Sequence, residues 1–167
     1  PSELFSYPDS SIFRLLSDER IKADKPLARE LGCQVGDEWV QISGLRTLGD
    51  DGMPICLADV YVIPEYGSIA QRLGGSSRPV YEMIAEIFEE SIQNITIRLT
   101  AGVLSEPKAA KLGVEPGSPS LSVSRFYQGR GGRVFEASIS EHPASNFSYT
   151  FEFTRGWQTA DHWSWNN

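Results

Sequence analysis

The sequence has 167 residues, of which 40% are hydrophobic and 22% charged, the composition of one soluble globular domain. No apolar run approaches the roughly 20 residues that a membrane span needs, and no secretory leader is visible, so we expect a cytoplasmic chain. The formal net charge of −7 argues against direct binding to DNA, because phosphate contacts need clustered Lys and Arg.

The first residue is Pro1 rather than Met, which favours a fragment of a longer protein. Cys33 and Cys56 are the two cysteines, and they make no metal-ligand spacing with His142 or His162. We therefore expect no metal site and no cofactor. No nucleophile elbow and no Walker loop is present, and nothing else in the sequence demands catalysis.

The predicted elements begin after an irregular stretch over residues 1–26, in which residues 12–16 form a short helical or docking segment. A short helix over 27–31 ends at Gly32, the residue that helices favour just past their last turn. Alternating apolar residues predict a strand over 38–48, a hairpin turn over 49–52 and a return strand over 54–63.

The second half of the chain begins with a helical turn at 69–73. An apolar stripe from Val80 to Ser91 follows, with the spacing of an amphipathic helix packed on a sheet. The remaining predicted elements are a strand over 95–103, a helix over 107–112, strands over 121–127, 134–140 and 147–153, and a Trp-rich tail. About six strands, mostly joined by hairpins, predict an antiparallel sheet with flanking helices and hence the α+β class.

The two halves of the chain resemble each other. Residues Leu31, Gly32, Gly36 and Gly52 return as residues 112, 113, 117 and 132, a shift of 81 or 80 positions. Such a constant shift indicates a duplicated supersecondary unit. We expect a sheet with pseudo-symmetric halves and a cleft on it.

An arginine lies in the first strand of each repeat. Arg46 shares a strand face with Val40 and Ile42, and Arg125 shares one with Leu121 and Val123. A guanidinium that points into a core needs a carboxylate or an anionic ligand. The alternative is an arginine at a strand end that has already reached solvent.

An acid lies in the second strand of each repeat, Asp59 in the first and Glu136 in the second. Either acid could receive polar groups of a ligand, or pair with an arginine in a purely structural ion pair. Tyr61, Tyr81 and Tyr149 are candidate walls of a pocket, or plain core residues whose hydroxyls are satisfied.

These landmarks resemble the UTRA domain, the effector-binding domain of HutC-subfamily regulators in the GntR superfamily, which has the chorismate lyase fold. The resemblance covers residues 27–154 and depends on the order and spacing of several short pieces. The pieces are Leu31-Gly32-x-x-x-Gly36, Asp51-Gly52-x-Pro54, Tyr61-Val62-Ile63-Pro64, Leu112-Gly113-x-x-x-Gly117-x-Pro119, Arg125, Gly132-x-x-x-Glu136 and the segment from Asn146 to Phe151. On this basis residues 1–26 are a linker remnant or N-terminal docking segment, and residues 155–167 are a C-terminal tail.

The resemblance implies a ligand-sensing homodimer whose DNA-binding winged helix lies upstream of this chain. Effector binding would change how the two DNA-binding heads are held, which is allosteric coupling between two sites. It also implies site residues: Arg46 matches a strand arginine that often meets an anionic group of the effector, and Asp59 lies where many members have Glu. Tyr81, Glu136 and Tyr149 match further family positions.

Three departures from the family pattern argue against a sugar-phosphate effector. Pro79 stands where relatives that bind sugar phosphates carry Ser, Asp59 is one methylene shorter than Glu, and Asn146 replaces a common Asp. The main hypothesis is a non-catalytic sensor domain for a small, anionic metabolite. The alternatives are an enzyme of the chorismate lyase type on the same fold and a pure dimerisation module.

Overall fold

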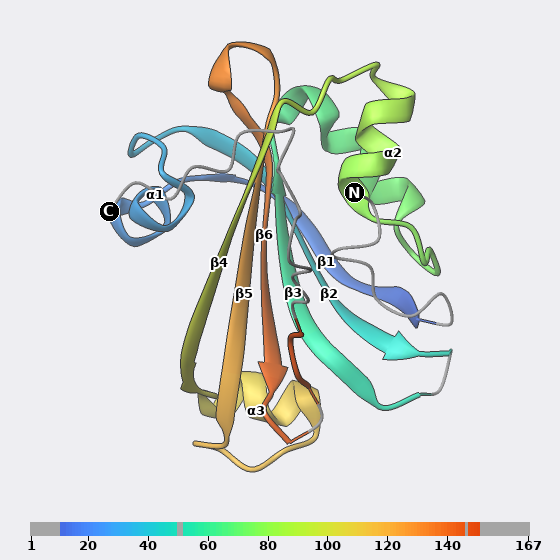
Figure 1. Cartoon of the computed structure of the whole chain (residues 1–167), viewed down its shortest axis with the longest axis vertical. Helices are drawn as coiled ribbons and strands as arrows, with labels where there is room; N and C mark the ends of the chain where they lie inside the picture. The colour runs from blue at the N-terminus through green and yellow to red at the C-terminus, as the bar shows by residue number, and fades with distance from the viewer. Residues whose placement is uncertain (1–10, 50–51, 146, 151–167) are drawn as a thin grey trace, which may run out of the picture.

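The computed structural model describes residues 11–49, 52–145 and 147–150. Its elements in chain order are β1 (Ser11–Lys22), α1 (Lys25–Leu31), β2 (Glu38–Leu48), β3 (Pro54–Val62), η2 (Pro64–Arg72), α2 (Val80–Ile87), β4 (Asn94–Val103), α3 (Glu106–Leu112), β5 (Pro119–Gln128), η3 (Arg130–Gly132) and β6 (Val134–Pro143). Figure 1 shows the strands side by side, with α2 near one end of the sheet and α3 near the other.

All six strands form one sheet in the order β1-β2-β3-β6-β5-β4, and every neighbouring pair is antiparallel. The α+β class and the antiparallel sheet predicted from the sequence are confirmed. The order is symmetric about the β3–β6 pair, so each half of the chain contributes three consecutive strands of the sheet.

The duplication seen in the sequence is a β-α-β-β unit. α1 is followed by Gly32 with φ 67° and ψ 33°, and α3 is followed by Gly113 with φ 68° and ψ 31°, the left-handed conformation that favours glycine. In the first half Ala23 N donates to Asp37 O at 2.8 Å, and at the equivalent place Leu104 N donates to Ser118 O at 2.9 Å. The predicted pseudo-symmetric halves are therefore confirmed at the level of the backbone.

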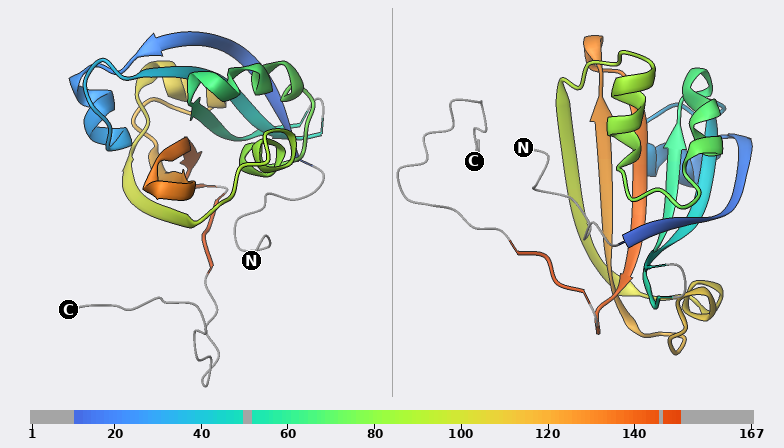
Figure 2. Two further views of the ribbon diagram at one scale, coloured as in Figure 1. Left: turned by 90° about the horizontal axis from the view of Figure 1, so that it is seen from above. Right: turned by 90° about the vertical axis from the view of Figure 1, so that its right-hand side faces the viewer.

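Helices cover both faces of the sheet. Figure 2 shows the sheet bending around η2 and α2, and we call this side the concave face; α1 and α3 lie on the other side, the convex face. η2 and α2 are the insertion between the two repeats, so they have no counterpart in the second half. α1 and α3 therefore cover the convex face symmetrically, whereas among the described helices only η2 and α2 cover the concave face, and they have no symmetric partners there.

The main core extends over both faces of the sheet, because it includes Ile84 of α2 on the concave side and Leu31 of α1 on the convex side. Ile42 of β2, Val62 of β3 and Ile84 of α2 are all 0% exposed. A smaller cluster on the convex face joins Leu45 and Leu57 to α3. The apolar stripe predicted from Val80 to Ser91 packs on the sheet where it lies in α2, with Val80, Met83 and Ile84 buried. The helix is shorter than the stripe: it ends at Ile87, Phe88 is its C-cap, and Glu89 takes a left-handed φ of 54°.

The structure differs from the sequence prediction at both ends of the described chain. Residues 11–22, predicted to be irregular, form β1, whose alternation is broken by a bulge between Leu15 and Ser17. The strand predicted over 147–153 is not found in residues 147–150, and residues 151–153 lie outside the described residues. β6 pairs with β3 on one side and with β5 on the other. The chain that leaves β6 therefore cannot fold back and pair with β6 itself.

Candidate functional site

Arg125 and Glu136 lie together on the concave face, at the centre of the second repeat. Antiparallel pairing sets Arg125 opposite Ser138 and Tyr127 opposite Glu136, so these four side chains share one face of β5 and β6. Arg125 is only 6% exposed and Glu136 only 2% exposed. The inward orientation that the sequence suggested for Arg125 is the one that the structure shows.

Glu136 is a buried acid that holds its proton. Burial raises the pKa of its carboxyl to about 8, and the positive charge of Arg125 opposes this only in part. Its Oε2 atom is buried and makes no hydrogen bond with the described part of the chain. At neutral pH the carboxyl is therefore largely protonated, and it can donate a hydrogen bond as well as accept one.

Tyr81, at the start of α2, forms a roof over this part of the sheet. Its ring stacks on Tyr127, with the ring centroids 4.5 Å apart and the planes inclined by 17°. Its hydroxyl donates to Glu82 Oε1 at 3.1 Å, and burial is the first cause that raises the pKa of Tyr81 to about 12. Tyr81 thus stays neutral at pH 7, and its ring packs against Tyr127 beside Arg125 and Glu136.

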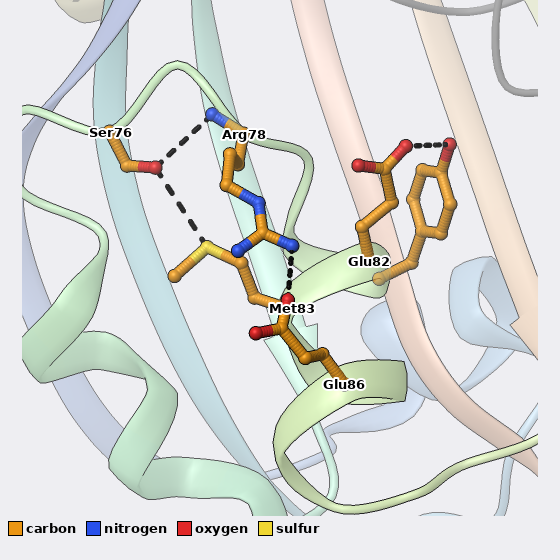
Figure 3. A network of polar contacts seen from close by, with 6 residues as sticks. Ser76, Arg78, Glu82, Met83 and Glu86 are labelled. Atoms are coloured by element: carbon orange, nitrogen blue, oxygen red, sulfur yellow. Dashed lines mark hydrogen bonds and ion pairs between the residues drawn. The ribbon is translucent and has the colours of Figure 1, made fainter.

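The loop before α2 is held to the helix by polar contacts, which Figure 3 shows. Arg78 Nη2 donates to Glu86 Oε2 at 2.6 Å, and Arg78 N donates to Ser76 Oγ at 3.1 Å. Ser76 Oγ also lies 3.8 Å from Met83 Sδ. These contacts join the loop to the first two turns of α2, the helix that carries Tyr81.

Tyr149 approaches the site from the other side. Phe147 stacks on His142 of β6 with 3.7 Å between the ring centroids, and Tyr149 meets Phe147 edge to face at 6.1 Å. The Tyr149 hydroxyl is buried, and Tyr149 is among the groups that raise the pKa of Tyr127, after burial and Glu136. Residues 147–150 therefore lie over the concave face near Tyr127.

Arg46 shares the concave face but lies apart from Arg125. β2 and β5 are separated by two strands, and at about 4.8 Å per strand spacing their backbones stand roughly 14 Å apart. Arg46 donates to Ser11 Oγ at 3.3 Å and to Ser77 O at 3.4 Å, and it lies 6.0 Å from the Phe13 ring. The two arginines therefore lie at different parts of the concave face.

Asp59 and Tyr61 lie on the convex face, so the structure does not bring them together with Arg125 and Glu136. Asp59 accepts hydrogen bonds from Ser43 Oγ and, at 3.3 Å, from Gln41 Nε2. Tyr61 is 6% exposed, and burial first and then the charge of Asp59 raise its pKa. The sequence placed both residues on one strand face correctly, but it could not show which side of the sheet that face joins.

His142 and Tyr127 belong to the concave cluster and were not among the predicted site residues. His142 is 0% exposed, its Nδ1 lies 3.2 Å from Leu121 O, and burial lowers its pKa to about 4. Tyr127 continues the alternation that contains Arg125, so this signal was present in the sequence. His142 could not be found in this way, because the predicted strand ended at residue 140.

A groove lies away from these residues, at the end of the sheet next to the C-terminus of α1. This open groove of about 960 Å³ is lined by Cys33, Trp39, Glu65, Arg133 and neighbouring residues, and by none of the predicted ligand-binding residues. Within the described ranges, no cluster of three or more His, Cys, Asp or Glu could hold a metal ion. No described helix is long and apolar enough to cross a membrane.

Comparison with known proteins identifies the fold and the family. The UTRA domain family model matches residues 9–148, so the chain belongs to the UTRA domain family. Comparison with curated protein sequences gives no match.

Solved structures of GntR-family regulators are similar to this chain. The effector domain of PhnF from Mycobacterium smegmatis matches with a TM-score of 0.72 and 18% identity, covering 87% of this chain and 88% of that one. A ligand-binding domain from Bordetella bronchiseptica, assigned to the GntR family, matches with a TM-score of 0.72 and 23% identity, covering 91% and 94%. A GntR-family regulator from Bacillus cereus matches with a TM-score of 0.72 and 17% identity, covering 87% and 99%. At these identities the likeness shows the shared fold.

Proposed function

We propose that this chain is the effector-binding and dimerisation domain of a cytoplasmic bacterial transcriptional regulator of the HutC subfamily. It binds a small anionic metabolite on the concave face, and binding alters how an upstream winged helix, absent from this chain, holds DNA. The observation that carries the proposal is the buried pair of Arg125 and Glu136 under the stacked rings of Tyr81 and Tyr127. A sheet core needs none of these polar groups for packing alone.

The chemistry of the pair favours an anionic group. The guanidinium of Arg125 is buried, and its planar fork of N–H groups can form two parallel hydrogen bonds with a carboxylate or phosphate. Because the pKa of Glu136 is raised to about 8, its carboxyl is largely protonated at pH 7 and can donate a hydrogen bond to the same ligand. Tyr149, with its buried hydroxyl, supplies a further wall.

Arg46, Asp59 and Tyr61 are not expected to contact the anionic group of the ligand. Arg46, on the same face but roughly 14 Å away in strand spacing, would meet only the far end of a longer ligand. Asp59 and Tyr61 are on the convex face and would affect the ligand only through the sheet.

A second candidate function is an enzyme of the chorismate lyase type on the same fold. The observation that favours it is Glu136 itself, since a buried carboxyl with a pKa of about 8 has the protonation state of a general acid. The two functions separate cleanly in one assay, because a lyase would release pyruvate from chorismate and a sensor would not.

The experiment is a thermal-shift screen of the purified domain against amino acids, small carboxylates, urocanate, sugar phosphates, fatty acids and chorismate. A ligand that binds only the folded state must raise the melting temperature by mass action. We expect one anionic class to do so, and we expect Arg125→Ala to abolish that shift.

The matched control is Arg130→Ala, which removes an exposed arginine from η3, next to the end of β5. It should keep the full ligand-induced shift. If Arg125→Ala is folded by circular dichroism and still shows the wild-type shift, the proposed site is wrong. If Arg125→Ala does not fold, Arg125→Lys replaces it, and a shift kept in full by that variant would also contradict recognition by the guanidinium fork.

A further inference from the structure

β4 is an edge strand that lacks the usual protection. It lies last in the sheet order and pairs only with β5, so among the described elements nothing covers its outer hydrogen-bonding groups. Figure 1 shows it along one side of the sheet, away from the helices of the concave face. Its pairing with β5 runs from Asn94 to Val103 without a bulge, which makes it a long, regular edge. Such an edge is a template for another strand.

The concave-side residues of β4 are all apolar. The register places one residue in two on the concave side, beside Tyr127, Arg125 and Val123 of β5. These concave-side residues form what we call the β4 stripe: Ile95, Ile97, Leu99, Ala101 and Val103. Leu99 is 39% exposed and Val103 is 71% exposed. An apolar row beside an open backbone edge indicates an interaction surface rather than scattered surface residues.

The opposite edge shows what protection looks like in this protein. β1 is the counterpart of β4 in the first repeat, yet it contains a bulge and five exposed charged residues, Arg14, Asp18, Glu19, Arg20 and Lys22. β4 contains no acid, no Lys and no Pro. Its one charged residue, Arg98, is held by Glu30 at 3.6 Å and lies 5.3 Å from the Phe126 ring. The equivalent strands of the two repeats therefore differ: β1 carries a bulge and charges that disfavour pairing with another strand, whereas β4 does not.

We propose that β4 pairs antiparallel with β4 of a second copy of this chain, which joins the two sheets into one continuous sheet across a two-fold axis. This names the surface of the homodimer in the proposed function and rests on that part of it. Addition of a strand at an open edge supplies main-chain hydrogen bonds, and a two-fold axis makes the contact self-complementary.

The side chains favour one register. With Leu99 next to the axis, Ile97 of each copy faces Ala101 of the other and Ile95 faces Val103, so large residues meet small ones on the concave side. Arg98 then faces Thr100. A shift by one residue in each chain would place Arg98 opposite Arg98, and like charges directly opposite are unfavourable.

Charge favours a second copy as the occupant. The chain carries a formal net charge of −7, so two copies repel each other over most of their surfaces. β4 has no acid of its own, and the nearby Glu30 is engaged by Arg98 and by Ser124 Oγ at 3.2 Å. A contact between two β4 strands therefore brings no two carboxylates of β4 together, so repulsion between acids is low at this edge.

The test is sedimentation equilibrium of the wild type, Leu99→Lys and the matched control Leu16→Lys. Leu16 is a similarly exposed leucine, 43% exposed, on the guarded edge β1. We expect the wild type to be a dimer. Leu99→Lys, which puts two like charges at the axis, should raise the dissociation constant about tenfold or more, whereas Leu16→Lys should leave it unchanged.

A cysteine pair gives an independent readout. Leu99→Cys should form an intermolecular disulfide under mild oxidation, because a residue beside the axis faces its own copy, and Leu16→Cys should not. A dimer that survives Leu99→Lys would overturn the β4 surface while leaving dimerisation standing. A wild type that is monomeric at every concentration, with β4 covered instead by the chain's own C-terminal segment, would overturn both. In either case the thermal-shift screen tests ligand binding at the Arg125–Glu136 site independently of the dimer surface.

Discussion

Glu136 is the residue whose chemistry most distinguishes this site. Its pKa of about 8 lies above the 4.5 of an ordinary glutamate, because burial disfavours its charged form. Between these two values the folded state keeps a proton that the unfolded state has lost. The free energy of unfolding therefore falls as pH rises through this window.

His142 acts in the opposite direction over part of the same range. Burial lowers its pKa from 6.5 to about 4, so the unfolded state binds the extra proton and stability rises with pH between these values. The two effects oppose each other between pH 4.5 and pH 6.5. Above pH 6.5 only the effect of Glu136 remains, up to about pH 8.

We therefore predict that Glu136→Gln flattens the dependence of stability on pH between pH 6.5 and pH 8. The wild type should lose stability over this range with a slope of at most about 1.4 kcal/mol per pH unit, whereas the variant should lose little. Urea unfolding at four pH values measures the slope.

Glu141→Gln on the same strand is the control for this prediction, because Glu141 lies on the convex face and pairs with Lys108 at 3.0 Å. It should keep the wild-type slope above pH 6.5. Equal slopes for the wild type and Glu136→Gln would show that Glu136 does not hold its proton in the folded protein.

At the scale of single residues, the sequence showed which side chains share a strand face but not which faces meet. Arg125 could be placed inward because Leu121 and Val123 precede it at alternate positions. Asp59 looked equally suitable, yet its alternation belongs to the convex face, where Ser43 and Gln41 bind it. Which side of a sheet a strand face joins is decided by pairing with distant strands, and a single strand carries no record of it.

The two short helices of the repeats allow a matched comparison. Asp24 caps α1, because its Oδ1 accepts a hydrogen bond from Leu27 N at 2.9 Å. Ser105 holds the equivalent place before α3, but its side chain makes no capping hydrogen bond. At this equivalent position, the side chain of Asp24 makes a capping hydrogen bond and that of Ser105 does not.

We predict that Asp24→Ala lowers the free energy of unfolding by about 1 kcal/mol, the usual value of an N-cap side chain. Ser105→Ala should change it by no more than a few tenths of a kcal/mol, because no hydrogen bond is lost. Chemical denaturation at neutral pH compares the two variants.

Asp24→Asn separates capping from charge. Asparagine also caps helices, so this variant should stay close to the wild type. A loss as large as that of Asp24→Ala would mean that the negative charge of Asp24, rather than its hydrogen bond, stabilises α1.

At the scale of elements, the sequence predicted best where turns and glycines mark the ends. α1, β2, β3, α3 and β5 were found with boundaries within about two residues, because Gly32, Gly113 and the alternating strands are local signals. β1 was missed because its bulge and exposed charges hide the alternation. About six strands were predicted and the described residues form six, but β1 is one of them, whereas residues 147–150 of the predicted last strand are not in a strand.

For the whole molecule, position in the sheet predicts the order of amide hydrogen exchange. β3 and β6 pair at the centre and are flanked by strands on both sides, so their amides should exchange slowest. β1 should exchange faster than β3 and β6 at every protein concentration. β4 should slow as the concentration rises, if copies pair there, and measurement by mass spectrometry at two concentrations checks this.

An exchange rate of β4 that does not depend on concentration would contradict pairing of copies at this edge within the range tested. Exchange from β3 and β6 that is as fast as exchange from β1 would contradict the central position of the β3–β6 pair in the sheet.

The two-fold likeness of the halves has a consequence for what can lie on the concave face. Equivalent places in the two repeats carry unlike side chains there: Gly44 against Arg125, Arg46 against Tyr127, and Cys56 against Glu136. The two halves of the concave face therefore present different side chains to a ligand, although the backbone of the sheet is symmetric. A molecule turned end for end would meet different groups, so divergence between two copies of one ancestral unit has given the face a direction that the backbone alone lacks.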